Sequence, residues 1–500
     1  MFVSDICILG GGPAGSTLAA RMAEFGYRVL LIERAMFPRA HLGESLSPGV
    51  LPLLEVVGMH DAVEAAGFSR VGRVRVLWDQ GSQWRRDPRR EGLLVDRGRF
   101  DALFLDRAKA RGVRVLQPAI LRERHWDGNA WHLRIRTETG IVESKTTFLA
   151  DASGRAAALP ARRRCTGCRT LALYAYWRGR RLPEEPRIEA GAEAWYWGVP
   201  LPDGTYNSLV FIDVEQFRGT ARGSVAARFH ELMARSGLMS GCHDARLAGS
   251  VLAADATPYI DERCITSCSI KIGDAALALD PLSSSGVQKA IQNALAGSVV
   301  VNTLLRKPDS SAAAIRFFQE SVNTASKSHR RWAARHYLQV ARRGGGPFWQ
   351  ERAAEALMES SLAGPQTTPA QRIQPGASIE LSSRLEFVDL PCIEGHWVTM
   401  KTALRHPSLD EPLAFLGGWE IAPLLKRLGG GLTSAQIAQS WSNQISMKSA
   451  LALIAWLIDR GILVQRPPAA PSEGSAHGPT REATLTVGAY SYGSQLANQE

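Results

Sequence analysis

Three glycines near the start of the chain have the spacing of a dinucleotide-binding turn. Gly10, Gly12 and Gly15 follow the apolar stretch "DICIL" and lead into small residues typical of a helix. Such glycines allow a tight turn and a close approach of the backbone to a pyrophosphate, which the helix N-terminus stabilises. A second apolar stretch ends in Glu33, placed to accept ribose hydroxyls. The predicted dinucleotide site comprises Gly10, Gly12, Pro13, Ala14, Gly15, Glu33 and Arg34, which fit FAD and NAD equally well.

Three later segments narrow the choice of cofactor. They are "VDRGRFDALFLDRA" (95–108), "DASGR" (151–155) and "GDAALALDPLSSSGVQKAIQNALAGS" (273–298). Together with the glycine turn, and in this order, they resemble the FAD-dependent aromatic monooxygenases and halogenases. The resemblance implies FAD as the cofactor. It also implies that Gly273 and Asp274 hold the ribityl chain or the pyrophosphate of FAD, and that Arg97 and the backbone of Ser285, Gly286 and Val287 reach the flavin.

Further segments resemble the flavin-dependent tryptophan halogenases within that group. They are "FPRAHLGESLSPG" (37–49), "WYWGVP" (195–200) and "RHYLQVARRGGGPFW" (335–349). The resemblance implies that His41, Glu44 and Ser45 lie beside the flavin. The alternation in "WYWGVP" predicts a strand with Trp195 and Trp197 on one face. The two indoles would line the path from flavin to substrate, or they would simply fill the core.

The chain departs from the halogenases at the residue that carries their halogen. Those enzymes pass hypohalous acid to a lysine, whereas the matching stretch "AGFSRVGRVRVLW" has Arg70, and the first lysine of the chain is Lys109. A guanidinium stays protonated and cannot replace that amine. We therefore expect an FAD-dependent monooxygenase that hydroxylates an electron-rich aromatic ring through a C4a-hydroperoxyflavin. His41 or Glu44 would accept the proton, and Arg70 would bind an acidic group or steady the peroxide.

Two alternatives stay open, namely a flavin-dependent halogenase of an indole or phenol, and a non-catalytic FAD-fold partner in protein maturation. Halogenase-like enzymes without the lysine include those that hydroxylate a protein tryptophan to build the cysteine tryptophylquinone cofactor. This chain is similar to them, which implies a protein or peptide tryptophan as the aromatic substrate. The sequence has one GxGxxG pattern, so the electrons would come from transiently bound NAD(P)H or from a separate flavin reductase.

The expected fold is α/β, an FAD-binding Rossmann-type domain with an inserted β-sheet substrate domain and a small winged-helix-like C-terminal domain. The catalytic region would span 1–362, with the inserted sheet at about 75–95 and 165–255. A Pro/Gln/Ser-rich linker, 363–378, precedes a compact segment, 379–466. That segment reads as three helices and a strand with Thr433 and Ser446 as N-caps, and would be a docking domain or a structural cap. The Ala/Ser/Gly/Pro-rich tail, 467–500, is expected to be disordered.

Composition and charge restrict the classes of partner, compartment and metal site that the chain can have. The 500 residues carry a net charge of +11, with basic clusters at 85–90, 162–164 and 330–343, but no nucleic-acid-reading module. No apolar run reaches the roughly 20 residues of a membrane span. The seven cysteines are scattered and no secretion signal precedes them, so we expect reduced thiols in the cytoplasm. The Cys165/Cys168 pair lacks a matching second pair nearby, and no metal site is expected.

Overall fold

The computed structural model describes residues 2–78, 83–86, 91–219, 224–362, 374 and 376–466. The chain divides into two compact units, which are described separately. The first comprises 1–364 with 395–398, and the second comprises 365–394 with 399–500. Most of the predicted linker (363–378) and the whole predicted disordered tail (467–500) lie outside the described residues.

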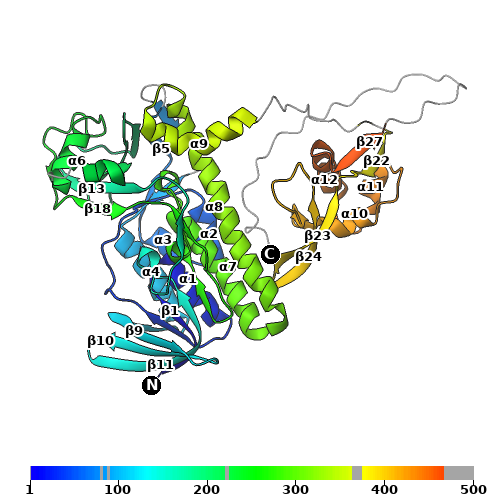
Figure 1. Ribbon diagram of the computed structural model, residues 1–500, viewed down its shortest axis with the longest axis horizontal. Helices are drawn as coiled ribbons and strands as arrows, with labels where there is room; N and C mark the ends of the chain where they lie inside the picture. The colour runs from blue at the N-terminus through cyan, green and yellow to red at the C-terminus, as the bar shows by residue number, and fades with distance from the viewer. Residues whose placement is uncertain are drawn as a thin grey trace, which may run out of the picture. The chain divides into compact units, whose positions relative to one another are not determined.

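A mixed sheet in the first unit positions the glycine turn (Figure 1). Its order is β8-β2-β1-β11-β10-β9, and β20 also pairs with β11. The pairs β8–β2, β2–β1, β1–β11 and β11–β20 are parallel, and β9–β10–β11 are antiparallel. The bounds are β1 (Phe2–Leu9), β2 (Val29–Ile32), β8 (Arg114–Leu116), β9 (Ala119–Trp126), β10 (Trp131–Thr137), β11 (Gly140–Asp151) and β20 (Ser269–Lys271).

Helix α1 (Pro13–Glu24) follows β1 directly and is buried along most of its length, because its small residues allow close packing. It packs against β1 and β2 and against α4 (Arg97–Ala110) and α7 (Gly286–Arg306). The β1–α1–β2 unit that the glycine spacing predicts is therefore present, and the predicted α/β class is confirmed.

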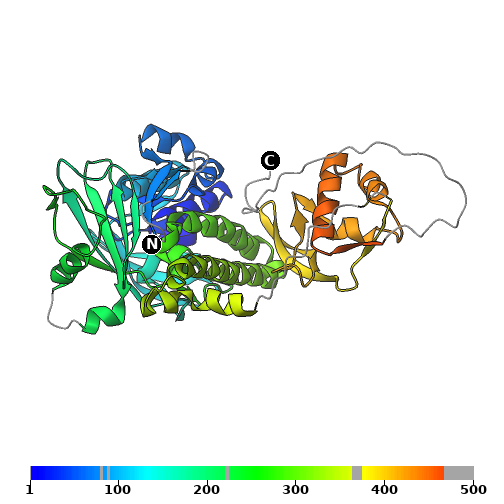
Figure 2. The same ribbon diagram turned by 90° about the horizontal axis from the view of Figure 1, so that it is seen from above.

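A second sheet lies at one end of the first unit, drawn in green in Figure 2. Its order is β17-β13-β16-β15-β14-β5-β6, with β18 also paired to β13. Apolar side chains cover both faces, and one face packs on α6 through Phe229. The bounds are β5 (Arg73–Leu77), β6 (Gln83–Arg86), β13 (Thr170–Arg178), β14 (Arg187–Ala190), β15 (Trp195–Pro200), β16 (Tyr206–Asp213), β17 (Arg246–Leu247), β18 (Leu252–Asp255), α5 (Val214–Gly219) and α6 (Val225–Met233).

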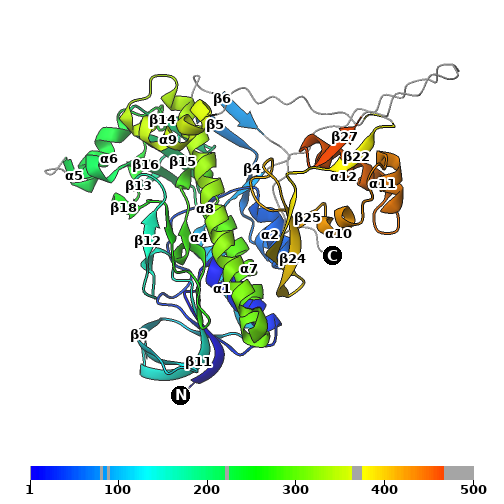
Figure 3. The ribbon, with the colours of Figure 1, turned by 45° about the vertical axis from the view of Figure 1, so that its right-hand side comes forward.

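Helices α7 and α8 lie side by side (Figure 3). Helix α8 (Ser311–Ala341) continues into α9 (Pro347–Leu362), and both contribute to the core of the second sheet through Tyr337 and Trp349. None of the helices in the described part of the chain is both long and apolar enough to cross a membrane.

Two small sheets border two loops, the first at 37–44 before β3 and the second at 279–285 after β21, which are called the first and second flavin loops below. The first sheet has the order β3-β7-β4 and the second sheet has the order β12-β19-β21. The bounds are β3 (Ser45–Leu46), β4 (Ser69–Val71), β7 (Gly92–Leu94), β12 (Arg163–Cys165), β19 (Tyr259–Asp261), β21 (Leu277–Ala278), α2 (Val50–Val56), α3 (His60–Ala65), η1 (Gly154–Ala156), η2 (Gly273–Ala275), η3 (Pro281–Ser283) and η4 (Pro308–Ser310).

The second unit has a hydrophobic core of its own, built on helices α10, α11 and α12 and on the β22–β27 pair. Thr433 and Ser446 cap helices α11 and α12 through their hydroxyls, which confirms both predicted N-caps. The bounds are β22 (Ser378–Leu381), β23 (Glu386–Glu394), β24 (Trp397–Arg405), β25 (Phe415–Leu416), β26 (Trp419–Glu420), α10 (Ile421–Lys426), α11 (Ser434–Ser440), α12 (Met447–Asp459) and β27 (Leu463–Arg466).

Candidate functional site

The three glycines of the turn have different structural roles. Gly10 has φ +106°, and a Cβ there would lie 2.5 Å from the carbonyl oxygen of Ala152. A Cβ at Gly15 would collide with the carbonyl of Gly10. Gly12 has φ −71°, and its Cβ would meet only a nitrogen of Arg39, at 3.5 Å. The chain's own packing thus requires Gly10 and Gly15, whereas Gly12 keeps space open in front of α1.

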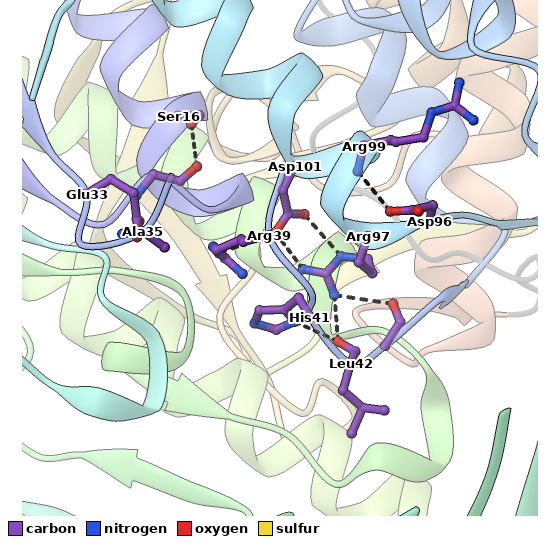
Figure 4. Close-up of polar contacts among 12 residues, drawn as sticks. Ser16, Glu33, Ala35, Arg39, His41, Leu42, Asp96, Arg97, Arg99 and Asp101 are labelled. Carbon is purple, nitrogen blue, oxygen red and sulfur yellow. Dashed lines mark hydrogen bonds and ion pairs between the residues drawn. The ribbon is translucent and has the colours of Figure 1, made fainter. Parts of the chain in front are cut away.

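The N-terminus of α1 faces that space without a side-chain cap. Pro13 has no N–H to satisfy, and the amides of the next residues supply the donors and the positive end of the helix dipole. Glu33 is buried at the end of β2, where its Oε2 accepts from the Gly11 amide at 2.7 Å and its Oε1 from the Ala35 amide at 2.9 Å (Figure 4). The side chain of Arg34 is exposed.

A second uncapped helix N-terminus lies at the start of α7. Ser285 makes no side-chain capping bond there, and a Cβ on Gly286 would meet nothing within 4 Å. Val287 is buried. Gly273 has φ +62°, and its Cβ would be 2.9 Å from that of Ala14, so α1 and the Gly273–Asp274 turn approach closely. Two glycine-led helix N-termini, open space at Gly12 and Gly286, and the buried acid Glu33 fit the phosphates, ring and ribose of FAD.

Arg97 fixes the loop that contains His41 and Leu42 (Figure 4). Its guanidinium is buried and donates to the carbonyl oxygens of Leu42 at 3.1 Å and Gly43 at 3.2 Å. It also forms a two-point contact with the Asp101 carboxylate, at 3.1 and 3.2 Å. Sequence reasoning did not identify Asp101. The contact of Arg97 with the flavin stays a prediction, and the structure shows Arg97 shaping the adjacent loop.

His41 is exposed on this loop, and its hydrogen bonding defines its tautomer. Its Nδ1 lies 2.7 Å from the Leu42 carbonyl oxygen and must donate to it, which leaves Nε2 as an acceptor. Although part of the His41 side chain reaches solvent, the surrounding chain desolvates the ring, and this desolvation and the charge of Arg97 lower the pKa of His41, while Asp101 acts in the opposite direction. The imidazole is therefore neutral near pH 7 and able to take a proton.

Glu44 is buried and joins the loop to the second sheet. Its carboxylate accepts from the Tyr176 hydroxyl at 2.7 Å, the Gly43 amide at 2.9 Å and the Asn207 amide at 3.3 Å. Burial, followed by the Glu44 charge, raises the pKa of Tyr176, so the hydroxyl stays protonated and donating. Within the described residues, Asn207 Oδ1 is buried without a hydrogen-bond partner. Glu44 thus anchors the loop on β13 and β16, in addition to its proposed chemistry.

The two tryptophans of β15 share one face of the strand, as the alternation predicts. Trp195 is 2% exposed and stacks on Phe211 with ring centroids 3.7 Å apart. Trp197 is only partly buried and packs on the same aromatic cluster, which also receives Leu42 and Leu282 from the two flavin loops. Trp195 therefore contributes to the core, and a role for either indole in the path from flavin to substrate stays a prediction.

Arg70 lies on β4, which β7 joins to β3 and Ser45. Its side chain is exposed and forms an ion pair with Glu64. It borders a cavity of about 520 Å³ whose other charged lining residues are Arg73, Glu91, Glu184 and Glu185. This cavity is lined by none of the residues of the glycine turn, so it is not the flavin pocket. A role for Arg70 in binding substrate stays a prediction.

Contacts from distant segments hold the second flavin loop, and sequence reasoning missed them. The Asp280 carboxylate accepts from the Tyr337 hydroxyl at 2.9 Å, and the Asp280 carbonyl oxygen lies 3.1 Å from His329 Nε2. Single polar residues on a long helix give no sequence signal for such a contact. Among the described residues, no three His, Cys, Asp or Glu side chains gather as a metal site would require.

Comparison with known proteins agrees with this geometry. A family model described as tryptophan halogenase matches residues 88–368, and one described as FAD dependent oxidoreductase matches residues 5–162. The chain is 32% identical over 385 residues to a tryptophan 2-halogenase of Chondromyces crocatus, covering 71% of this chain and 72% of that protein.

Two solved structures resemble nearly the whole chain. The flavin-dependent halogenase CmlS has a TM-score of 0.74 at 18% identity, covering 93% of this chain and 96% of that one. The peptidyl tryptophan dihydroxylase QhpG, essential for tryptophylquinone cofactor biogenesis, has a TM-score of 0.71 at 27% identity. That similarity covers 92% of this chain and 99% of QhpG.

Proposed function

Because the chain belongs to the tryptophan halogenase family of FAD-dependent, O2-using oxidoreductases, we propose that it hydroxylates a tryptophan side chain of a protein or peptide. The observation that carries this proposal is the sequence of the first 108 residues, which contains no lysine and has Arg70 where the family's halogen-carrying amine is expected. Support comes from QhpG, a peptidyl tryptophan dihydroxylase similar to this chain over 92% of its length.

The residues of the site have distinct roles in this proposal. Bound FAD, once reduced, supplies the activation of O2. Glu44 and Arg97 hold the loop 41–44 in place, which keeps the free Nε2 of His41 available to take the proton that the ring loses. The aromatic cluster around Trp195 and Trp197 excludes water from the substrate side.

The second unit is proposed to dock the polypeptide that carries the target tryptophan. It has its own hydrophobic core, and it leaves Met447 of α12 and Val464 of β27 exposed at 42% and 43%. An extended polypeptide can pair with a short strand and place its apolar side chains against such exposed positions. A purely structural role for this unit is the competing interpretation.

Halogenation of an indole or phenol is the second candidate function, favoured by the 32% identity to a tryptophan 2-halogenase. To separate the two, the enzyme is given reduced FAD, O2, a tryptophan-containing polypeptide and excess bromide, and the product is weighed. We expect oxygen-containing product without bromine, because Arg70 cannot form a haloamine. A bromine isotope pattern would show that another residue performs the lysine's task.

The pH dependence tests the proton acceptor. The pKa of His41 is lowered in the folded protein, so its imidazole stays neutral and able to take a proton down to a lower pH than usual. We therefore expect kcat/KM to fall only when the pH drops below about 6.5, the ordinary pKa of histidine. His41→Gln should lower kcat/KM by about 100-fold and abolish this acidic limb. The measurement is kcat/KM against pH for both proteins. An unchanged limb in the variant would assign the titration to another group.

A further inference from the structure

Lys289 is a buried lysine that no part of the proposed mechanism uses. It is 7% exposed and lies in the first turns of α7, close behind the uncapped N-terminus at Ser285 and Gly286. A lysine is almost never fully buried unless its ammonium is paired. The environment of this ammonium therefore indicates what it does.

Two acceptors surround the ammonium, and both belong to the flavin-binding turn region. The Nζ atom donates to Asp274 Oδ1 at 2.7 Å and to the carbonyl oxygen of Leu277. One helical turn further along α7, Asn293 accepts from the Gly273 amide at 2.9 Å. One face of α7 thus holds both residues of the Gly273–Asp274 pair, through a charge and through a neutral hydrogen bond.

The same lysine controls the charge of Asp274. Burial alone would raise the pKa of this carboxyl, but the charges of Lys289 and Arg155 outweigh burial and hold the pKa below its ordinary value. The other groups that face it are His41, whose charge would also lower the pKa, and Tyr259, whose hydroxyl donates to the backbone oxygen of Asp274 at 2.7 Å. Arg155 is 3.9 Å from Asp274 Oδ2, so the closest compensating charge is that of Lys289.

We propose that Lys289 is a positioning residue for the cofactor, which keeps Asp274 ionised and oriented as a hydrogen-bond acceptor for FAD. The Asp274 side chain is 37% exposed, whereas the Lys289 side chain that pairs with it is 9% exposed. An ionised acceptor binds the hydroxyl groups of a ligand more strongly than a neutral acid does. FAD retention should therefore depend on the positive charge at position 289.

The test compares FAD affinity in three variants by fluorescence titration of the apoprotein. Lys289→Gln keeps the length and a donor but loses the charge, and should weaken FAD binding by about 10- to 100-fold. The weakening should grow as the pH falls from about 8 to about 6, since the pKa of Asp274 rises without the neighbouring charge. Lys289→Arg should restore most of the affinity and remove the pH dependence. Lys289→Met removes both the charge and the donor. Folded Lys289→Met protein should therefore show the same weakened FAD binding as Lys289→Gln.

Lys271 provides the matched control. It is equally buried and lies two residues before Gly273, but its ammonium pairs with Asp261 at 2.6 Å and donates to the Pro160 carbonyl oxygen instead of contacting the Gly273–Asp274 pair. Lys271→Gln should lower thermal stability and leave the FAD affinity and its pH dependence as in the unmodified protein. Unchanged FAD affinity in Lys289→Gln at both pH values would overturn the proposal. An equal loss of affinity in Lys289→Arg would overturn it as well, because it would show that packing and not charge matters.

Discussion

Replacing Gly12 with valine should make the purified protein lose its FAD while leaving the protein folded. The backbone at Gly12 has φ −71°, which any residue adopts, and a Cβ there meets only Arg39 at 3.5 Å. The new side chain would instead fill the space that the pyrophosphate needs at the start of α1. A clash of about 3 kcal/mol is enough to raise the Kd for FAD by about 100-fold. The measurement is flavin absorbance of the purified variant, with a thermal melt to verify folding.

Two further glycine substitutions make this result interpretable. Gly346→Val places the same side chain where nothing lies within 4 Å of a Cβ, and should retain the full flavin content. Gly15→Ala should destabilise the protein itself, because its Cβ would collide with the Gly10 carbonyl. A yellow, fully loaded Gly12→Val protein would contradict the assignment of this turn to the pyrophosphate.

Removing residues 363–500 should separate docking from chemistry. We expect the truncated enzyme to keep FAD and to modify a short tryptophan peptide at an unchanged rate. Its kcat/KM for the natural polypeptide should fall by about 100-fold or more, because a tethered second binding surface raises the effective concentration of the substrate. The two substrates are compared by mass spectrometry under identical conditions.

The short peptide is the internal control in that experiment. Equal losses with both substrates would mean that truncation damages the first unit, and FAD content reports this independently. Equal turnover of the full polypeptide by the truncated and complete enzymes would make the second unit a structural cap only.

Local sequence signals predicted the parts of the site that depend on neighbouring residues. The glycine turn, its helix and Glu33 could be identified because each needs a particular residue type at a fixed offset from the turn. The alternation in "WYWGVP" placed Trp195 and Trp197 on one face for the same reason, since side chains alternate along a strand.

The contacts between distant segments could not be predicted. Glu44 meets Tyr176 across 132 positions and Asn207 across 163, and only the packing of the loop on the second sheet brings them together. The sequence could not show that Trp195 stacks on Phe211 in the core, because the two residues lie on different strands. The burial of Lys289 could not be predicted either, because the sequence does not show which side of a helix a single charge occupies.

The most direct test of the central claim is the mass of the target tryptophan after turnover in isotopically labelled oxygen gas, with bromide present. The account predicts that the residue gains labelled oxygen and no bromine, and that the gain requires FAD. Oxygen that carries no label would mean that it came from water. Bromine on the indole would mean that this chain halogenates despite having Arg70 in place of the lysine, and either result would contradict the proposed hydroxylation.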